Sequence, residues 1–153
     1  MKPETDPISP DEWLIRLVFH TRFTAKAPII GASAFEPRVV GDAPDVDGIS
    51  LFRRDCLNEP TDALLAIRET SRSLTGLVQL PVSLFTELGL SVRVKCIPES
   101  AGHVVISELN STVYAANKAR FTPIRKRLAE VASENILRRP PSTESDDADK
   151  KNG

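Results

Sequence analysis

Arginine and histidine occur together in the first apolar run of the chain, at residues 14–20. Side chains of a β-strand alternate between two faces, so Arg16 and His20 are predicted to share one face, with Val18 between them. Arg22 lies on the same face if the strand continues. A planar guanidinium binds phosphate or carboxylate through two parallel hydrogen bonds. Arg16 and Arg22 are therefore our candidates for binding an anion.

A purely structural role is the competing interpretation of the same residues. In that case Arg16 pairs with a carboxylate and His20 ends the strand in water. No motif elsewhere in the sequence decides between the two interpretations. Whether the chain is an enzyme therefore stays open at this level.

Other site chemistries have weaker support. The two histidines and two cysteines show no paired spacing of the kind that zinc sites use, so no metal is predicted. Cys56 follows the charged residues 53–55, which could lower the pKa of its thiol, with His20 or His103 as a base. A small, partly buried cysteine after a charged turn explains Cys56 equally simply. No glycine-rich phosphate-binding loop is present in the sequence.

Composition and charge narrow the class of protein. The chain has 153 residues, of which 41% are hydrophobic, and this suits one domain. Its 20 basic and 21 acidic residues produce no field that would favour nucleic acid. No apolar run approaches the roughly 20 residues that span a bilayer, and no secretion signal opens the chain. We therefore expect a cytoplasmic protein that binds neither membranes nor nucleic acid.

The elements that must position these residues are predicted from periodicity and from turn residues. Strands are expected at 14–20, 33–35, 48–52, 76–80, 90–96 and 103–107, and helices at 59–67 and 81–88. The strand at 90–96 alternates strictly, which places four residues on the core face: Leu90, Val92, Val94 and Cys96. This order favours the α+β class, as a single compact domain with a mostly antiparallel sheet and short helices.

An amphipathic helix is predicted near the carboxyl end, with Thr122 as its cap and Pro123 at its first position. Its apolar residues recur at helical spacing: Ile124, Leu128, Val131, Ala132 and Ile136. The basic residues between them are expected on the solvated face: Arg125, Lys126 and Arg127. Polar composition predicts disorder at 1–10 and in a charged tail at 140–153, which leaves 11–139 as the folded domain.

Four segments together resemble a group of small uncharacterised bacterial proteins. These are Ile15-Arg16 with the later His20, then Ser33-Ala34-Phe35, Gly48-Ile49-Ser50-Leu51 and Gly102-His103-Val104-Val105-Ile106. The resemblance covers about residues 14–106 and transfers no activity. Our first functional hypothesis is a cytoplasmic protein without a cofactor that acts through a protein partner, in a toxin, immunity or defence operon. The oligomeric state is not set by the sequence.

The arginine-bearing first strand and the later serine-bearing strand are also similar to small toxins of the ADP-ribosyltransferase fold. Those proteins bind NAD in a cleft between two sheets. This resemblance implies that Arg16, His20 and Ser50 hold NAD and that Glu108 polarises it. The catalytic candidates are then His20, Ser50, His103 and Glu108. The alternative requires Arg16, His20, Ser50 and Glu108 to line one cleft.

Overall fold

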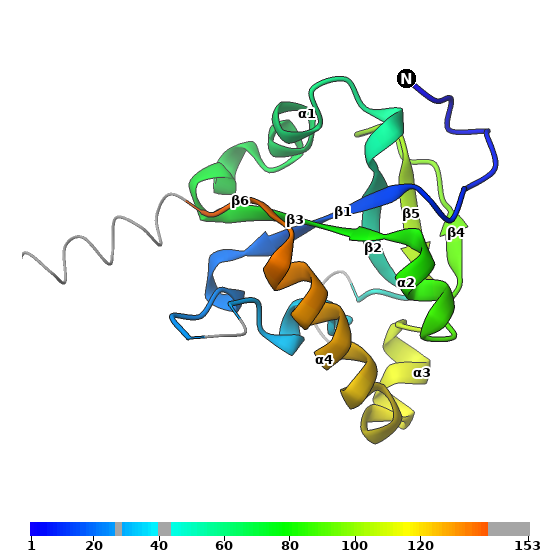
Figure 1. Ribbon diagram of the computed structural model, residues 1–153, viewed down its shortest axis with the longest axis vertical. Coiled ribbons are helices and arrows are strands. Elements are labelled where there is room, and N and C mark those ends of the chain that lie inside the picture. Colours follow the sequence, from blue (N-terminus) through cyan, green and yellow to red (C-terminus); the bar gives the residue numbers. More distant parts are fainter. Residues whose placement is uncertain (27–28, 40–43, 141–153) are drawn as a thin grey trace, which may run out of the picture.

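A computed structural model describes residues 1–26, 29–39 and 44–140 of the chain. The predicted tail at 140–153 lies outside the described residues, apart from Pro140. The described part is an α+β domain, as predicted, with one antiparallel sheet in the order β4-β5-β2-β1-β3-β6 (Figure 1). The strands are β1 (Trp13–Phe19), β2 (Ile49–Arg53), β3 (Thr75–Pro81), β4 (Val92–Val94), β5 (His103–Ile106) and β6 (Ile136–Arg138).

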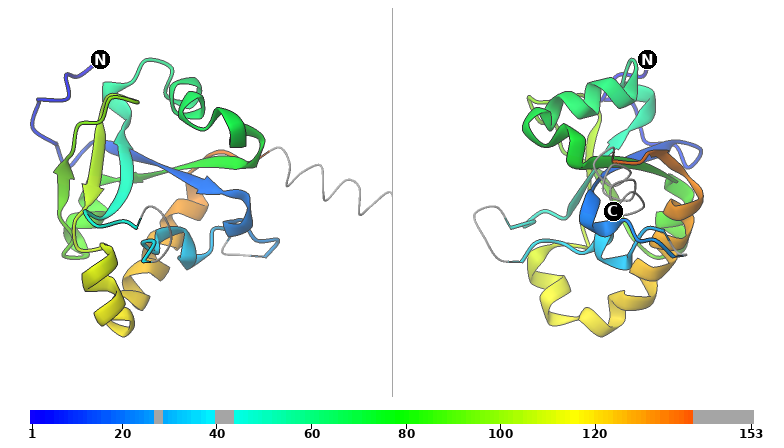
Figure 2. Two further views of the ribbon diagram at one scale, coloured as in Figure 1. Left: turned by 180° about the vertical axis from the view of Figure 1, so that it is seen from behind. Right: turned by 90° about the vertical axis from the view of Figure 1, so that its left-hand side faces the viewer.

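Helices pack on both faces of this sheet (Figures 1 and 2). They are α1 (Pro60–Ile67), α2 (Val82–Glu87), α3 (Ser111–Ala116) and α4 (Lys118–Glu134). Leu14 and Val18 of β1 join the larger core together with α4, whereas Ile15 joins a smaller core together with α1. The predicted alternation along β1 therefore holds, because a strand between two helical layers buries both of its faces. No helix in the described ranges is both long and apolar enough to cross a bilayer.

The sheet is split between β1 and β2. Strand β1 pairs with β3 along its whole length, from Trp13 opposite Pro81 to Phe19 opposite Thr75. It pairs with β2 only where Leu14 faces Arg53 and Ile15 faces Phe52. Beyond these pairs the two strands diverge, as the two views in Figure 2 show. Polar groups of β1 and β2 that a continuous ladder would bond to each other must find other partners there.

The prediction for residues 90–96 is wrong in its second half. Strand β4 comprises only Val92–Val94, and it lies at the edge of the sheet. Leu90 is buried, but Val94 is 47% exposed and Cys96 is also exposed. An edge strand has a neighbour on one side only, and the strand ends at Val94. Strict alternation therefore does not bury both ends of this segment.

The two cysteines should differ sharply in reactivity. Cys96 is exposed, whereas Cys56 is buried, and burial raises the pKa of the Cys56 thiol despite the opposing charge of Arg53. We expect Ellman's reagent to react rapidly with one thiol of the native protein and with the second only after unfolding. A Cys96→Ser variant should lose the rapid phase. A rapid phase that persists in this variant would place Cys56 at the surface instead.

Two further elements differ from the sequence prediction. Residues 33–35 do not form a strand, because Ala32–Phe35 is a short 3-10 helix, η2, that packs against α4. Helix α4 begins at Lys118, so Pro123 lies inside it, and the hydroxyl of Thr122 donates to the carbonyl of Lys118. Pro123 is tolerated because it removes only one hydrogen bond, close to the start of the helix.

The end of α4 also differs from the prediction. The helix stops at Glu134, and Ile136 lies in β6, which pairs with β3. Leu128 and Ala132 are buried as expected, and Lys126 and Arg127 are exposed. The prediction for Arg125 is wrong, because its side chain is only 12% exposed. Its guanidinium packs over the ring of Tyr114, 5.3 Å from the centroid.

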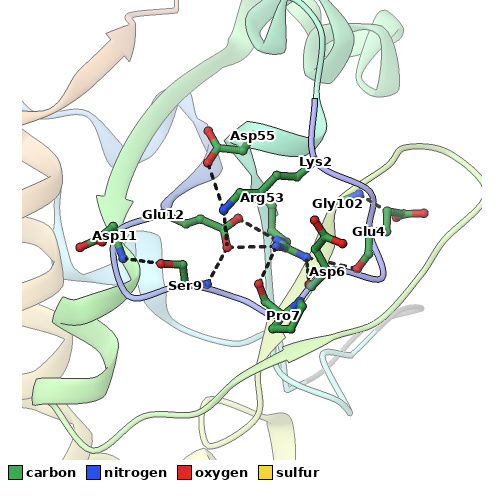
Figure 3. Close-up of polar contacts among 10 residues, drawn as sticks. All are labelled: Lys2, Glu4, Asp6, Pro7, Ser9, Asp11, Glu12, Arg53, Asp55 and Gly102. Carbon is green, nitrogen blue, oxygen red and sulfur yellow. Dashed lines mark hydrogen bonds and ion pairs between the residues drawn. The ribbon is translucent and has the colours of Figure 1, made fainter.

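The amino-terminal segment, expected to be disordered at 1–10, instead wraps around Arg53 (Figure 3). Arg53 is 0% exposed, and its Nε and Nη2 donate to the two carboxylate oxygens of Glu12 at 2.9 and 3.0 Å. The same guanidinium donates to three backbone carbonyls, those of Glu4 at 3.2 Å, Asp6 at 2.8 Å and Pro7 at 3.3 Å. Composition suggested disorder because the segment has few apolar residues. A buried guanidinium needs several acceptors, and this segment supplies them.

Candidate anion-binding site

A cavity of about 360 Å³ occupies the split between β1 and β2. Its wall comes from β1, the 3-10 turn η1 (His20–Arg22), β2, η2, the loop after η2 and the chain that runs from the end of α1 to the start of β3. Four arginines and two carboxylates line it: Arg16, Arg22, Arg38 and Arg68, with Glu36 and Asp45. The cavity is therefore cationic on balance, although the whole chain has a net charge of −1.

Arg16 lies where the ladder between β1 and β2 ends. Continuing the register of these strands would place Leu17 opposite Ser50, but pairing stops at Ile15 and Phe52. The Arg16 side chain fills this gap, since its Nη1 donates to the carbonyl of Ser50 at 2.8 Å. Its Nε donates to the carbonyl of Ala34 in η2 at 3.1 Å. The two carbonyls hold the guanidinium in the cavity wall.

The charge of Arg16 has no direct counter-ion in the described part of the chain. Burial lowers the pKa of Arg16 to about 10, Asp45 opposes the change, and Arg68 and Arg38 add to it. The group therefore stays protonated at neutral pH, in surroundings that disfavour its charge. The structural interpretation required Arg16 to pair with a carboxylate, and no described carboxylate forms that pair. An anion in the cavity would relieve this unfavourable charge.

Two more arginines of the cavity, both exposed, also lack a carboxylate partner among the described residues. Arg22 donates to the hydroxyl of Ser33 at 3.4 Å and has no ion pair within the described ranges. The exposed side chain of Arg68 makes neither a hydrogen bond nor an ion pair with any described residue. By contrast, Arg38 is 3.7 Å from the carboxylate of Asp45. Three of the four guanidinium groups thus have no carboxylate partner among the described residues.

The predicted anion-binding residues, Arg16 and Arg22, do line one cavity, although Arg22 belongs to the 3-10 turn η1 (His20–Arg22) and not to β1. Sequence reasoning missed Arg38 and Arg68. Both belong to segments outside the strands, and no local pattern marks them. Only the packing of these segments beside the split brings them to Arg16.

Ser50 and His103, two of the catalytic candidates, are in direct contact. Strands β2 and β5 pair Ser50 with Val105 and Phe52 with His103, so Ser50 and His103 are diagonal neighbours. His103 Nε2 is 2.9 Å from Ser50 Oγ, and His103 Nδ1 is 2.6 Å from the carbonyl of Lys95. A carbonyl only accepts hydrogen bonds, so Nδ1 carries the proton of the neutral ring and donates it. Nε2 then accepts from the Ser50 hydroxyl.

His20 and Glu108 lie outside this cavity. Strand β1 ends at Phe19, so the prediction that one strand carries Arg16 and His20 is wrong. The ring of His20 instead contacts that of Phe19 edge-on, with centroids 4.7 Å apart. The predicted strand included His20 because the alternation of residue types continues past the point where the backbone turns.

Glu108 follows β5 and has a structural role there, because it binds Ser91, which precedes β4. Its carboxylate accepts hydrogen bonds from the backbone N–H and the hydroxyl of Ser91, both at 2.7 Å. Burial raises the pKa of Glu108, but the hydrogen bonds from Ser91 outweigh this and lower it. Of the four residues that the NAD-binding alternative requires in one cleft, Arg16 and Ser50 line the cavity, whereas His20 and Glu108 do not.

Comparisons of the chain with protein-family models, with curated proteins and with solved structures found no match. Within the described residues, no group of three or more His, Cys, Asp or Glu side chains is placed to hold a metal ion. The cavity and its surroundings offer arginine, serine and histidine side chains for chemistry, together with the carboxylates of Glu36 and Asp45.

Proposed function

We propose that the protein binds a small oxyanionic ligand, a phosphate ester or a polycarboxylate, in the cavity between β1 and β2. The observation that carries this proposal is the environment of Arg16. Two backbone carbonyls hold its guanidinium in the cavity wall, and no described carboxylate lies within ion-pair distance. Arg22 and Arg68 line the same cavity and also lack such a partner. A guanidinium group without a carboxylate partner can bind phosphate or carboxylate oxygens of a ligand through two parallel hydrogen bonds.

The size of the cavity favours a small molecule over a polymer. Its volume of about 360 Å³ lies within the roughly 300–1,000 Å³ of ordinary small-molecule sites. Its cationic groups converge on one hollow, whereas a nucleic-acid site needs an extended basic surface. Asp45 and Glu36 at the wall offer acceptors for hydroxyl or amino groups of the same ligand.

Calorimetric titration with pyrophosphate, citrate and NAD tests the proposal. We expect saturable binding of pyrophosphate or citrate that weakens with added salt. Arg22→Gln and Arg68→Gln should each weaken it about tenfold, since a hydrogen bond to a charged group contributes roughly 1.5–3 kcal/mol. The matched control is Arg72→Gln, because Arg72 is exposed and outside the cavity, 3.9 Å from Asp62.

The results of this titration are decisive in each direction. Tighter binding of pyrophosphate indicates a phosphate ester, and tighter binding of citrate indicates a polycarboxylate. No saturable binding of either anion, or equal weakening in Arg72→Gln, would overturn the proposal. Binding of NAD would support the ADP-ribosyltransferase-like alternative, which the positions of Arg16 and Ser50 favour and those of His20 and Glu108 do not.

The hypothesis of a protein partner in a toxin, immunity or defence operon is carried by the sequence resemblance. We propose that this chain binds both the anion and a protein partner, and that it does so in the cytoplasm. Reduced thiols are the rule in that compartment, and Cys56 and Cys96 are free thiols. Co-purification of a product of a neighbouring gene with the tagged full chain would support the partner. Recovery of the chain alone, at its monomer mass, would contradict it.

A further inference from the structure

We infer that Ser50 is a nucleophile and His103 its general base, and that together they hydrolyse a carboxylic ester that carries an anionic group. The ester would bind in the arginine-lined cavity, so its anionic specificity rests on the proposed function. The reactivity of the serine itself depends only on the Ser50–His103 contact. These two parts can therefore be tested separately.

The contact has the geometry of an activated serine. The distance of 2.9 Å between Ser50 Oγ and His103 Nε2 lies within the range of a nucleophile and its base. The third group of such a site, which orients the histidine, is here the carbonyl of Lys95, 2.6 Å from Nδ1. It fixes the tautomer in which Nε2 can take the serine proton.

The surrounding strands hold the histidine rigidly. The backbone N–H of Lys95 donates to the carbonyl of His103 at 3.0 Å, and the His103 ring donates to the carbonyl of Lys95. Two hydrogen bonds therefore join these residues. The Lys95 ammonium is also paired with the carboxylate of Asp47. The ring of Phe52 lies 5.2 Å from the imidazole, centroid to centroid, and His103 is 6% exposed. This packing restricts the imidazole to the orientation that faces Ser50.

The serine, unlike the histidine, is part of the cavity wall. The carbonyl of the same residue accepts the hydrogen bond from Arg16, so the nucleophile and the anion-binding cation are anchored to one position of β2. A serine and a histidine that merely satisfied each other inside the sheet would need neither the cavity nor the cation. This coincidence favours a chemical role for Ser50 over a structural one.

The reaction balances with water as the only co-reactant. Ser50 Oγ forms a bond to the carbonyl carbon of the ester, and its proton moves to His103 Nε2. The bond to the leaving alcohol then breaks, and the alcohol takes this proton. Water attacks the acyl-serine next, gives one proton to Nε2, and Ser50 Oγ recovers that proton as the acid leaves. The arginines bind the anionic group of the substrate throughout.

A fluorophosphonate probe tests the reactivity of the serine on the full chain. We expect mass spectrometry to find the label on Ser50, and labelling should be lost in Ser50→Ala. His103→Gln, which keeps a polar group at this position, should slow labelling about 100-fold, since general-base catalysis contributes typically 10²–10⁴-fold. Ser83→Ala, at an exposed position of α2, is the matched control and should label like the wild type.

Ester hydrolysis tests the preference for an anionic substrate. We expect mono-4-nitrophenyl succinate to be cleaved faster than 4-nitrophenyl butyrate, and Arg68→Gln to reduce this preference about tenfold. If Ser50 is not labelled in the wild type, or if turnover survives in Ser50→Ala, the nucleophile is refuted, whether or not anions bind. If Ser50 is labelled but neutral and anionic esters react alike, the nucleophile stands and the anion site fails. Circular dichroism of each variant identifies one that has not folded, and Ser50→Ala remains decisive if His103→Gln does not fold.

Discussion

Replacement of Glu12 by alanine is expected to lower the free energy of unfolding by about 3–5 kcal/mol. The substitution removes the carboxylate that accepts two hydrogen bonds from Arg53 and leaves the guanidinium without its counter-ion. Both side chains are almost completely buried, so water cannot replace the missing partner. Breaking a buried ion pair on one side costs far more than losing an exposed one, whose contribution is small.

Urea titration followed by circular dichroism measures this effect. Asp11→Ala is the matched control, because Asp11 is the exposed neighbour of Glu12 and forms no ion pair within the described residues. Its stability should stay within error of the wild type. A double variant with Glu12→Leu and Arg53→Met should recover part of the loss, since it removes both buried charges. Equal, small losses in Glu12→Ala and Asp11→Ala would show that the amino-terminal segment does not cover Arg53.

The ion pair of Glu12 and Arg53 also makes the stability of the protein depend on pH. Burial raises the pKa of Glu12, but hydrogen bonds from Arg53 and Ser9 outweigh it and lower the pKa from its ordinary value of 4.5. A carboxyl whose pKa is lower in the folded protein contributes stability that is complete above its unfolded pKa. That contribution is lost as the pH falls through the folded pKa. The wild type should therefore lose stability below about pH 4.5 more steeply than Glu12→Gln.

The second large effect is expected at Leu128 of α4. This side chain is fully buried in the larger core, and Leu128→Ala should lower the free energy of unfolding by about 2–5 kcal/mol. Lys126→Ala should leave it unchanged within error, because Lys126 is exposed. Arg125→Ala should fall between them, at about 1–2 kcal/mol, because Arg125 donates to the carbonyl of Ala32 and covers the ring of Tyr114.

Urea titrations of these three variants decide how α4 is attached. The order Leu128, Arg125, Lys126 in decreasing cost is the expected result. Equal and small effects from all three would mean that the helix is detached from the sheet. An Arg125→Ala variant as stable as Lys126→Ala would place Arg125 on the solvated face, as sequence periodicity alone had predicted.

Much of the fold could be predicted from the sequence. The α+β class, the strands at β2, β3 and β5, the start of α1 and the stop of α2 before Gly89 all follow from patterns within a few residues. These features depend on which side chains a strand or helix must bury and on the residues that form turns. The spacing and types of residues within a short segment indicate both. The alternation that places Arg16 on one face with Leu14 and Val18 is of the same kind.

The wrong predictions share one physical cause. The spacing of residues within a segment does not show which other segments pack against it. The alternation of 90–96 could not show that β4 lies at an edge of the sheet, where Val94 and Cys96 meet solvent. The composition of residues 1–10 could not show that Arg53 needs their carbonyls. The periodicity of α4 placed Arg125 outward, although η2 and Tyr114 cover that part of the helix.

The candidate site divides in the same way. The sequence by itself supplied the residue types and the position of Arg16 and Ser50 on strands, together with His20 and Glu108 as equal candidates. Only the tertiary structure decided which of them meet, because the contacts that matter join Arg16 to Ser50 across 34 residues of chain and Ser50 to His103 across 53. The order of strands in the sheet and the split between β1 and β2 set those distances. Both are long-range properties of the packed chain, and no short stretch of sequence determines them.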